Sequence, residues 1–437
     1  MSEVQIGISS GQTKRLLTGG KYCPENILVT AQKVPEEKEV NFYDFDGTLL
    51  HSFTIEEARA LTELPQVTNP PKDCLKFAGW NWTLEAVQNL TIPMDIGALY
   101  TTENGATVLE IELTEYDLEV TIHFSQTAEN GTTWDFGDNT ATETPAATGQ
   151  QSISHTYAQP GKYTMLVFSN AGTYTFANGT TGYNAFGMYA QGNYTTTFLT
   201  AAHMGKNSKM GQWAFAGCNY LKYITLNPEV TYYNVGTYGL AQCYHLHCVN
   251  LPCGSIPTNT CAFIRDSSLQ VVTCSNLLTH IMFGAFRYCY SLKRVRVLPG
   301  IQLSEGYQFD ECRNLQSAPA CAGLAGNTKS FGLCFGLKEI TFAEGSKAIA
   351  ANIVDQCVSL QKIVLPSAIT SIGASAFNSC VSLKLLVFQA EMPPAVANAN
   401  AFNGIPADCV VEVPAVSLGI YQEATNYSGI AAQMVGV

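Results

Sequence analysis

Charged residues are scarce in this sequence, and basic residues are the scarcer kind. Asp, Glu, Lys and Arg make up 13% of the 437 residues, and 35 acidic against 23 basic side chains give a formal net charge of -12. Because proteins bind phosphate backbones through basic surfaces, we expect no nucleic-acid partner. Apolar residues make up 46% of the chain, enough to fill real cores, and its length allows about three domains of ~150 residues.

Long apolar segments are absent as well. No run of residues approaches the ~18 apolar positions of a membrane span, and no short basic and apolar leader precedes the first candidate domain. We therefore expect no membrane insertion. The sequence also predicts synthesis in a reducing cytoplasm, with a route out of the cell other than a signal peptide if the protein acts outside it.

The fifteen cysteines lack the paired spacings of a disulfide framework. Seven of them occupy one position of a repeat of about 23 residues that runs from Ala214 to Phe402. In this frame a large apolar residue is followed after three positions by Cys, after three by Leu, after three by an aliphatic residue and after two by an apolar one. The eight residues at the Cys position are Cys218, Cys243, Asp266, Cys289, Cys312, Cys334, Cys357 and Cys380.

The spacing of this repeat fits neither a single amphipathic helix nor a long strand. It predicts a solenoid in which the apolar positions of successive turns stack into one column, while the last alternating pair of each turn forms a short parallel strand. Residues Ala376–Leu383 and Cys357–Pro366 resemble the BspA-type leucine-rich repeat. Residues Val411–Pro414, followed by Tyr421 and Tyr427, resemble the usual end of such arrays.

An Asp-x-Asp-Gly-Thr motif that begins at Asp44 is the most enzyme-like feature of the chain. It is similar to the opening motif of haloacid dehalogenase phosphatases, which would make Asp44 a nucleophile and Asp46 an acid and base beside Mg²⁺. Those enzymes need a parallel sheet with helices, and the chain enters a β-rich module too soon to provide one. We therefore favour a β-hairpin with its turn at Asp46-Gly47, and we predict no catalytic residue.

The segment around this hairpin has the pattern of a small module. Strands are expected at 40–45 and 48–53, and a helix at 55–64. Together with Gly79-Trp80, residues 40–90 resemble the internalin-type or Listeria-Bacteroides β-repeat of surface proteins.

Short alternating strands follow at 108–113, 118–124, 152–157 and 163–168. This region resembles a PKD-type β-sandwich, and the motifs that carry the resemblance are Trp134-Asp135-Phe136-Gly137-Asp138, His155-Thr156-Tyr157 and Pro160-Gly161-Lys162-Tyr163. Asp135 and Asp138 have the chemistry of Ca²⁺ ligands, but Ca²⁺ needs six to eight oxygens. A turn at these residues is the favoured interpretation.

Two groups of side chains are candidates for binding. Zn²⁺ prefers Cys and His ligands, and such residues gather at Cys243, His245, His247, Cys248 and Cys253. Because Cys243 belongs to the repeat core and the spacings are not those of a zinc motif, we predict no metal site and no cofactor. The second group lies on or near the outward side of the predicted strands, where an open stacked sheet offers a wide recognition surface, and comprises Tyr223, Arg287, Lys293, Arg294 and Arg296. A merely solvated face is the alternative.

The sequence therefore predicts a mainly β, multidomain protein in which small β modules, one β-grasp-like and one a β-sandwich, precede a leucine-rich repeat solenoid. The expected parts are an N-terminal attachment segment (1–35), an internalin-like β-repeat module (36–107), a PKD-like β-sandwich (108–170), an N-terminal cap (171–213) and the solenoid with its C-terminal cap (214–437). Residues 20–31 also resemble a short segment of tail and fibre proteins from phages of Gram-positive gut bacteria.

These resemblances imply a non-enzymatic structural or adhesion protein. The favoured hypothesis is a phage tail-tip or fibre component of the virion, made in the host cytoplasm, whose solenoid contacts a host cell-surface protein or glycan. Its N-terminal segment would bind other virion tail proteins, and a homo-oligomer is compatible with this role. The alternative is a bacterial cell-surface or secreted adhesin of the BspA-like class.

Overall fold

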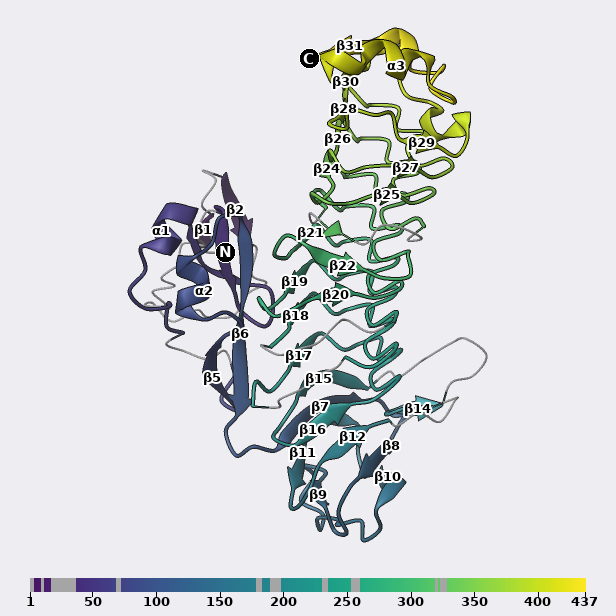
Figure 1. Ribbon diagram of the computed structural model, residues 1–437. Helices are drawn as coiled ribbons and strands as arrows, with labels where there is room; N and C mark the ends of the chain where they lie inside the picture. The colour runs from purple at the N-terminus through teal and green to yellow at the C-terminus, as the bar shows by residue number, and fades with distance from the viewer. Residues whose placement is uncertain are drawn as a thin grey trace.

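The computed structural model describes residues 37–67, 72–177, 198–229, 235–252, 260–318 and 328–437, together with the segments 4–8, 12–16, 183–188 and 321–322. Figure 1 shows a column of stacked turns that rises from a β-sandwich at its base, with a smaller module beside the lower turns. Near the N-terminus, β1 (Val4–Ile8) and β2 (Gln12–Leu16) pair as an antiparallel hairpin.

Residues 37–102 form a four-stranded sheet of order β4-β3-β6-β5 with two short helices. Its elements are β3 (Val40–Tyr43), β4 (Leu49–Phe53), α1 (Ile55–Arg59), β5 (Leu75–Trp80), α2 (Leu84–Gln88) and β6 (Met94–Thr102). Apolar side chains of both helices and of one face of β3 and β6 pack into a common core. This core is separate from the main core of the protein. We call residues 37–102 the N-terminal module.

The predicted hairpin is confirmed within this module. β3 pairs antiparallel with β4, and the carboxylate of Asp46 closes the turn by accepting a hydrogen bond from the Thr48 N–H at 2.8 Å. Gly47 has a φ of 88°, a conformation that glycine adopts without steric cost. The helix begins where expected, at a capping box of Thr54 and Glu57. It is shorter than the expected 55–64, since α1 ends at Arg59.

A β-sandwich forms the base of the column. Its strands are β7 (Thr107–Leu113), β8 (Glu119–Gln126), β9 (Thr132–Asp135), β10 (Gly149–Thr156) and β11 (Gly161–Ser169), all close to the expected ranges except β9, which the sequence pattern did not predict. The buried Trp134, Phe136 and Tyr157 fill its interior. The two sheets have the orders β10-β8-β12-β16 and β17-β15-β7-β11-β9.

Both sheets of the sandwich continue into the solenoid. The connecting strands are β12 (Tyr174–Phe176), β15 (Leu199–His203) and β16 (Ser208–Met210), while β13 (Tyr183–Asn184) and β14 (Gly187–Met188) form a separate antiparallel pair. β15 pairs antiparallel with β7 of the sandwich and parallel with β17 (Tyr223–Thr225) of the first turn. The sandwich therefore closes the open end of the stack, and its core is continuous with that of the solenoid.

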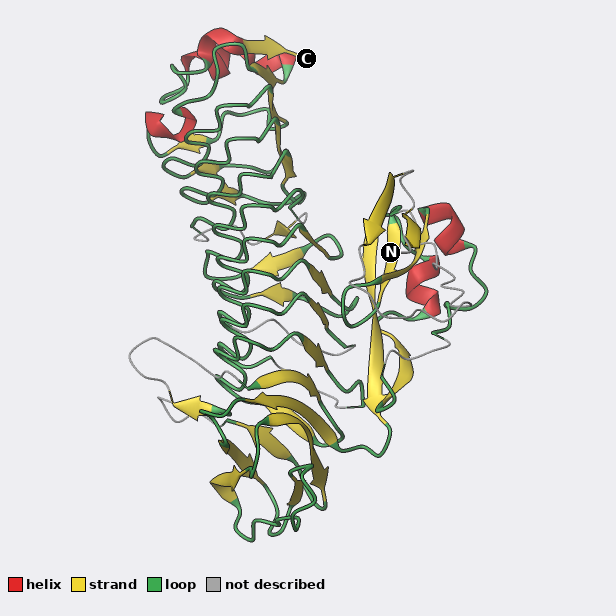
Figure 2. Cartoon of the chain, turned by 180° about the vertical axis from the view of Figure 1, so that it is seen from behind, coloured by secondary structure: helices red, strands yellow, loops and turns green. Residues whose placement is uncertain are grey.

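The turns of the solenoid stack two columns of parallel strands, as Figure 2 shows among the many connecting loops. The first column holds β18 (Cys248–Asn250), β19 (Val271–Thr273), β21 (Arg294–Arg296), β24 (Glu339–Thr341), β26 (Lys362–Leu365), β28 (Leu385–Phe388), β30 (Val410–Val413) and β31 (Met434–Gly436). The second holds β20 (His280–Ile281), β22 (Ile301–Leu303), β23 (Cys321–Ala322), β25 (Ala348–Ile349), β27 (Ser371–Ile372) and β29 (Ala395–Val396). In the first column Ile363 pairs with Ile340 on one side and Leu386 on the other, so the predicted parallel stacking is confirmed.

The repeated cysteines form a ladder through the core. All eight residues at this position are fully buried. The thiols of Cys289, Cys312 and Cys357 donate to the carbonyl oxygens of Phe263, Phe286 and Phe331, each at 3.0 Å and each in the preceding turn. A Cys therefore suits this position because it is small and apolar and still offers a weak donor to a buried carbonyl.

The C-terminal end of the stack is covered by η1 (Ala399–Phe402), η2 (Ala415–Ser417), α3 (Leu418–Glu423) and η3 (Ala431–Gln433). Tyr421 and Tyr427, expected to belong to the cap, are fully buried, and their hydroxyls donate to the carbonyls of Ala390 at 2.7 Å and Pro394 at 2.9 Å. None of the helices in the described part of the chain has the length and apolarity that a membrane crossing needs.

Candidate functional site

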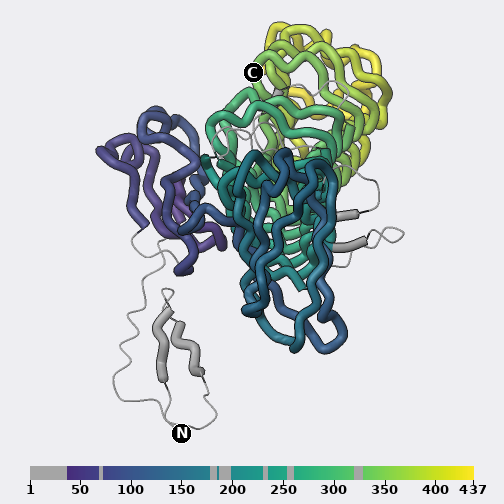
Figure 3. Tube along the Cα trace, turned by 90° about the horizontal axis from the view of Figure 1, so that it is seen from below, coloured from purple at the N-terminus to yellow at the C-terminus, as the bar shows by residue number. Residues whose placement is uncertain are grey.

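The outward face of the first strand column is the surface on which the sequence placed the candidate binding residues. In the structure the N-terminal module packs on this face over β18, β19 and β21. Figure 3, a view along the column, shows the module at one side of the stacked turns. Along β3 and β6, alternate residues such as Phe42 and Ile96 point into the module's own core. The residues between them, Asn41, Tyr43, Asp95 and Gly97, therefore face the solenoid.

A buried carboxylate holds the two surfaces together. Asp95 accepts from the Nε of Arg294 at 2.7 Å and from Nη1 of Arg296 at 3.0 Å. Arg294 also donates to the Tyr43 hydroxyl at 2.7 Å, and Arg296 donates to the Glu39 carbonyl at 2.8 Å. Burial alone would lower the pKa of the Arg294 guanidinium, but the Asp95 carboxylate raises it above its usual value, so Arg294 stays charged.

Neutral hydrogen bonds extend this contact across β18 and β19. Asn81 donates to Thr273 Oγ1 at 3.0 Å, and Trp82 donates to the Cys274 carbonyl at 2.8 Å. The two sheets approach so closely at Gly97 that a Cβ there would lie 2.1 Å from Thr273 Oγ1. The interface is therefore a hydrogen-bonded sheet-on-sheet contact, in which these polar groups have partners.

The expectation that Arg294 and Arg296 are exposed is consequently wrong. Their side chains are 18% and 20% exposed, because the N-terminal module covers them. Arg287 lies on a turn outside the strand column, where its guanidinium stacks between the rings of Tyr288 and Tyr307 and pairs with Asp310 at 2.9 Å. Nothing in the sequence around the arginines distinguishes a solvated strand face from a covered one.

The other two predicted residues lie beside the N-terminal module. Lys293 is exposed and, with Arg294, lines a cavity of about 190 Å³ at the seam with the module. Tyr223 is partly buried against the module, with Phe45 at 5.7 Å and the Lys72 ammonium at 5.4 Å from its ring. The structure therefore brings Lys293, Arg294 and Arg296 near each other but places Tyr223 and Arg287 elsewhere.

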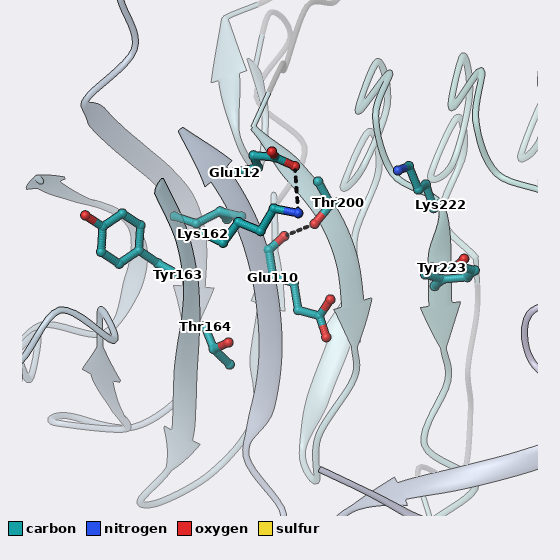
Figure 4. Close-up of a pocket in the computed structure, with 9 residues that line it drawn as sticks. Glu110, Glu112, Lys162, Tyr163, Thr164, Thr200, Lys222 and Tyr223 are labelled. Carbon is teal, nitrogen blue, oxygen red and sulfur yellow. Dashed lines mark hydrogen bonds and ion pairs between the residues drawn. The ribbon is translucent and has the colours of Figure 1, made fainter. Parts of the chain in front are cut away.

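Tyr223 also lines a cavity of about 360 Å³ on the sheet that joins the sandwich to the solenoid (Figure 4). Its charged side chains are Glu110, Glu112, Lys162 and Lys222. Lys162 lies 3.7 Å from Glu112, and the His203 ring with the Lys72 ammonium holds the pKa of Glu110 at about 2 despite partial burial. Glu112 is therefore paired with Lys162 inside the cavity, and Glu110 is paired with residues beside it.

The residues of the candidate zinc group do not converge. Cys243 is part of the ladder and donates to the Phe215 carbonyl, His245 is exposed and stacks on Tyr220, and Cys248 is buried against the N-terminal module. Cys253 lies outside the described residues. Within the described part of the chain, no three His, Cys, Asp or Glu side chains are grouped as metal ligands would be.

The remaining acidic candidates have structural partners. Asp44 accepts a hydrogen bond from the Tyr100 hydroxyl at 2.6 Å and lies at the seam with the solenoid. Asp135 accepts from the Gly137 N–H at 2.9 Å, and Asp138 pairs with His155 at 2.7 Å. The favoured turn at Asp135 and Asp138 is therefore confirmed.

The stacked parallel strands and their repeated core define a leucine-rich repeat solenoid on a β-sandwich. Comparison with protein families agrees: the model for the BspA type leucine-rich repeat region matches in six copies at residues 190–316 and 327–407, and the PKD domain model matches residues 113–175. The chain therefore contains a BspA-type leucine-rich repeat region and a PKD domain.

Three solved structures are similar to parts of this chain. A leucine-rich repeat protein from Bacteroides ovatus ATCC 8483 is 20% identical, with 54% of this chain and 77% of that chain covered and a TM-score of 0.28. The T. pallidum leucine-rich repeat protein is 18% identical, with 42% and 83% covered and a TM-score of 0.32. A leucine-rich cell surface protein from Faecalibacterium prausnitzii A2-165 is 17% identical, with 56% and 86% covered and a TM-score of 0.29. No curated protein matches the sequence.

Proposed function

We propose that this protein is a non-enzymatic binding protein of the BspA-like class, displayed on a bacterial surface or secreted, which recognises a macromolecular partner through its solenoid. The observation that carries the proposal is the continuous core, which runs from Leu109 in the sandwich to Met434 in the C-terminal cap. Such a core holds many turns in one long scaffold, and arrays of this kind present extended surfaces to partners.

The close pairs of titratable side chains support a structural rather than a catalytic role. Asp44 is engaged by Tyr100, Asp138 by His155 and Asp310 by Arg287. Each of these contacts closes a turn or joins neighbouring parts of the fold. A phosphatase activity that disappears in Asp44→Asn would overturn the non-enzymatic proposal.

Binding of the fluorescently labelled full chain to intact cells tests the proposal. The panel consists of Gram-positive and Gram-negative gut bacteria and cultured epithelial cells. We expect saturable binding to at least one cell type, competed by unlabelled protein. Binding that never exceeds that of an unrelated β-protein of similar net charge would contradict the proposal.

The phage tail role is a second candidate. It rests on the resemblance of residues 20–31, which lie outside the described part of the chain. Mass spectrometry separates the two roles: peptides of this protein in purified phage particles support a tail component, whereas peptides in cell-surface or culture-supernatant fractions of uninfected bacteria support the BspA-like proposal.

A further inference from the structure

The N-terminal module covers only part of the first strand column. Its contacts reach Arg294 and Arg296 on β21. Figures 1 and 2 show β24, β26, β28, β30 and β31 continuing beyond the module, and none of the elements in the described part of the chain lies over their outward face. The outward residues of these strands are Glu339, Thr341, Lys362, Val364, Leu385, Val387, Val410, Glu412 and Val435. We call this surface the free strand face.

The centre of the free strand face is aliphatic. Val364, Leu385 and Val387 are partly exposed, and Val410 and Val435 are each 42% exposed. Strand pairing brings four of them together in two pairs, since Leu385 lies beside Val410 and Val364 beside Val387, while Val435 lies beside Glu412 on the next strand. Clusters of exposed aliphatic side chains on a sheet commonly mark interaction sites.

The covered and free parts of the column differ in chemistry. Under the module the outward residues are Cys248, Asn250, Val271, Thr273 and the two arginines. Of these, Asn250, Thr273 and the arginines form hydrogen bonds and ion pairs with the module. On the free strand face, Glu339, Thr341 and Lys362 lie at the end nearer the module. The aliphatic cluster follows, with Glu412 between Val387 and Val435. The same column therefore offers one polar docking area, already occupied, and one apolar area that continues from it.

We propose that the free strand face docks a β-sheet surface of a partner protein, by the same sheet-on-sheet contact with which the N-terminal module occupies the adjoining strands. This inference rests on the proposed binding function and names its surface and partner class. Five neighbouring strands are separated by four spacings of ~4.8 Å, so this surface is about 19 Å long. A sheet carrying aliphatic side chains matches that shape and buries the exposed valines.

The aliphatic centre of this surface suits a protein better than a glycan. Each sugar hydroxyl that leaves water needs a hydrogen-bond partner, and the five aliphatic side chains provide none, so Glu339, Thr341, Lys362 and Glu412 would have to serve every hydroxyl. The outward positions of β24 to β31 also carry no aromatic ring on which a sugar could stack. An apolar protein surface avoids both difficulties, because aliphatic contacts require no polar partner.

The test compares two double variants of the full chain. Val410→Lys with Val435→Lys places two charges on the free strand face. Val358→Lys with Val381→Lys makes the same change on the turns before β26 and β28, where these valines are 37% and 54% exposed. Cell binding, thermal melting and sedimentation are measured for the wild type and both variants, on untreated cells and on cells treated with protease or periodate.

We expect the strand-face variant to bind at least tenfold more weakly, with its melting temperature unchanged, while the turn variant binds like the wild type. Protease treatment of the cells should abolish binding, and periodate should leave it intact. Wild-type affinity in the strand-face variant would overturn this inference and leave the proposed function standing. Periodate-sensitive, protease-resistant binding, or a wild-type dimer that only the strand-face variant dissolves, would show that a glycan or a second copy covers the face. A wild type that binds no cell would overturn both.

Discussion

Asp266 occupies the one ladder position that Cys does not hold, and replacing it provides a sharp test of the ladder. Its side chain is fully buried. Oδ1 accepts a hydrogen bond from the Cys243 N–H at 2.8 Å, and Oδ2 has no partner. By analogy with the other turns, a thiol at this position would donate to the carbonyl of Leu240. Asp266→Cys should therefore stabilise the solenoid.

The magnitude follows from the orphaned oxygen. A buried polar group without a partner costs about 1–3 kcal/mol, so we expect Asp266→Cys to raise the free energy of unfolding by about that amount at neutral pH. Cys289→Asp makes the reverse change in the next turn and should lower the free energy of unfolding by at least about 1–3 kcal/mol. Chemical denaturation followed by circular dichroism measures both.

The stability that Asp266→Cys adds should depend on pH. Burial raises the pKa of Asp266 well above its usual range, so the folded chain holds a proton that the unfolded chain releases. The stability of the wild type should thus fall as pH rises from about 4, the ordinary pKa of Asp, towards the raised value. Asp266→Cys and Asp266→Asn should both remove this dependence. An Asp266→Cys variant that is no more stable than the wild type at pH 7 would refute the role assigned to the ladder thiols.

Other predictions follow from the core, the interface and the sandwich. Leu292→Ala should cost about 2–5 kcal/mol of unfolding free energy, because it opens a cavity in one turn; chemical denaturation measures it. Gly97→Val should speed proteolysis within the N-terminal module without lowering the melting temperature of the solenoid. Hydrogen bonds from Thr140 and His155 lower the pKa of Asp138 to about 2 against the effect of burial, so the stability that His155→Ala removes should shrink as pH falls from about 4 towards 2. Under denaturing conditions without reductant, most cysteines should titrate as free thiols.

Local patterns in the sequence predicted much of the fold. The intervals of three, three, three and two fixed the register of every turn, since each inward position must meet its counterpart in the next. The Asp46-Gly47 pair indicated the hairpin because its turn chemistry is local. These features depend on residues close in sequence or repeated at one period, so no knowledge of the tertiary structure was needed.

The docking of the N-terminal module had no such signal. Asp95 and Arg294 are separated by 199 residues, and each alone resembles an ordinary surface charge. Two weak hints lie in the sequence: a glycine, Gly97, stands inside a strand, and the outward positions of β18 and β19 are small and uncharged, as at Asn250 and Thr273. Neither hint identifies the partner surface, because any buried contact would produce them.

Cys248 gives the most direct test of the central claim that the N-terminal module covers the strand face. Its thiol is 1% exposed and lies 3.7 Å from the Asp44 carbonyl of the module, whereas Cys357 is buried in the solenoid core and reports whether the turns remain folded. Maleimide labelling of the native chain, read by peptide mass spectrometry, should leave both thiols unmodified. Asp95→Lys sets a positive charge against Arg294 and Arg296 and should expose Cys248 while Cys357 stays protected. Rapid labelling of Cys248 in the wild type, with Cys357 protected, would contradict the account.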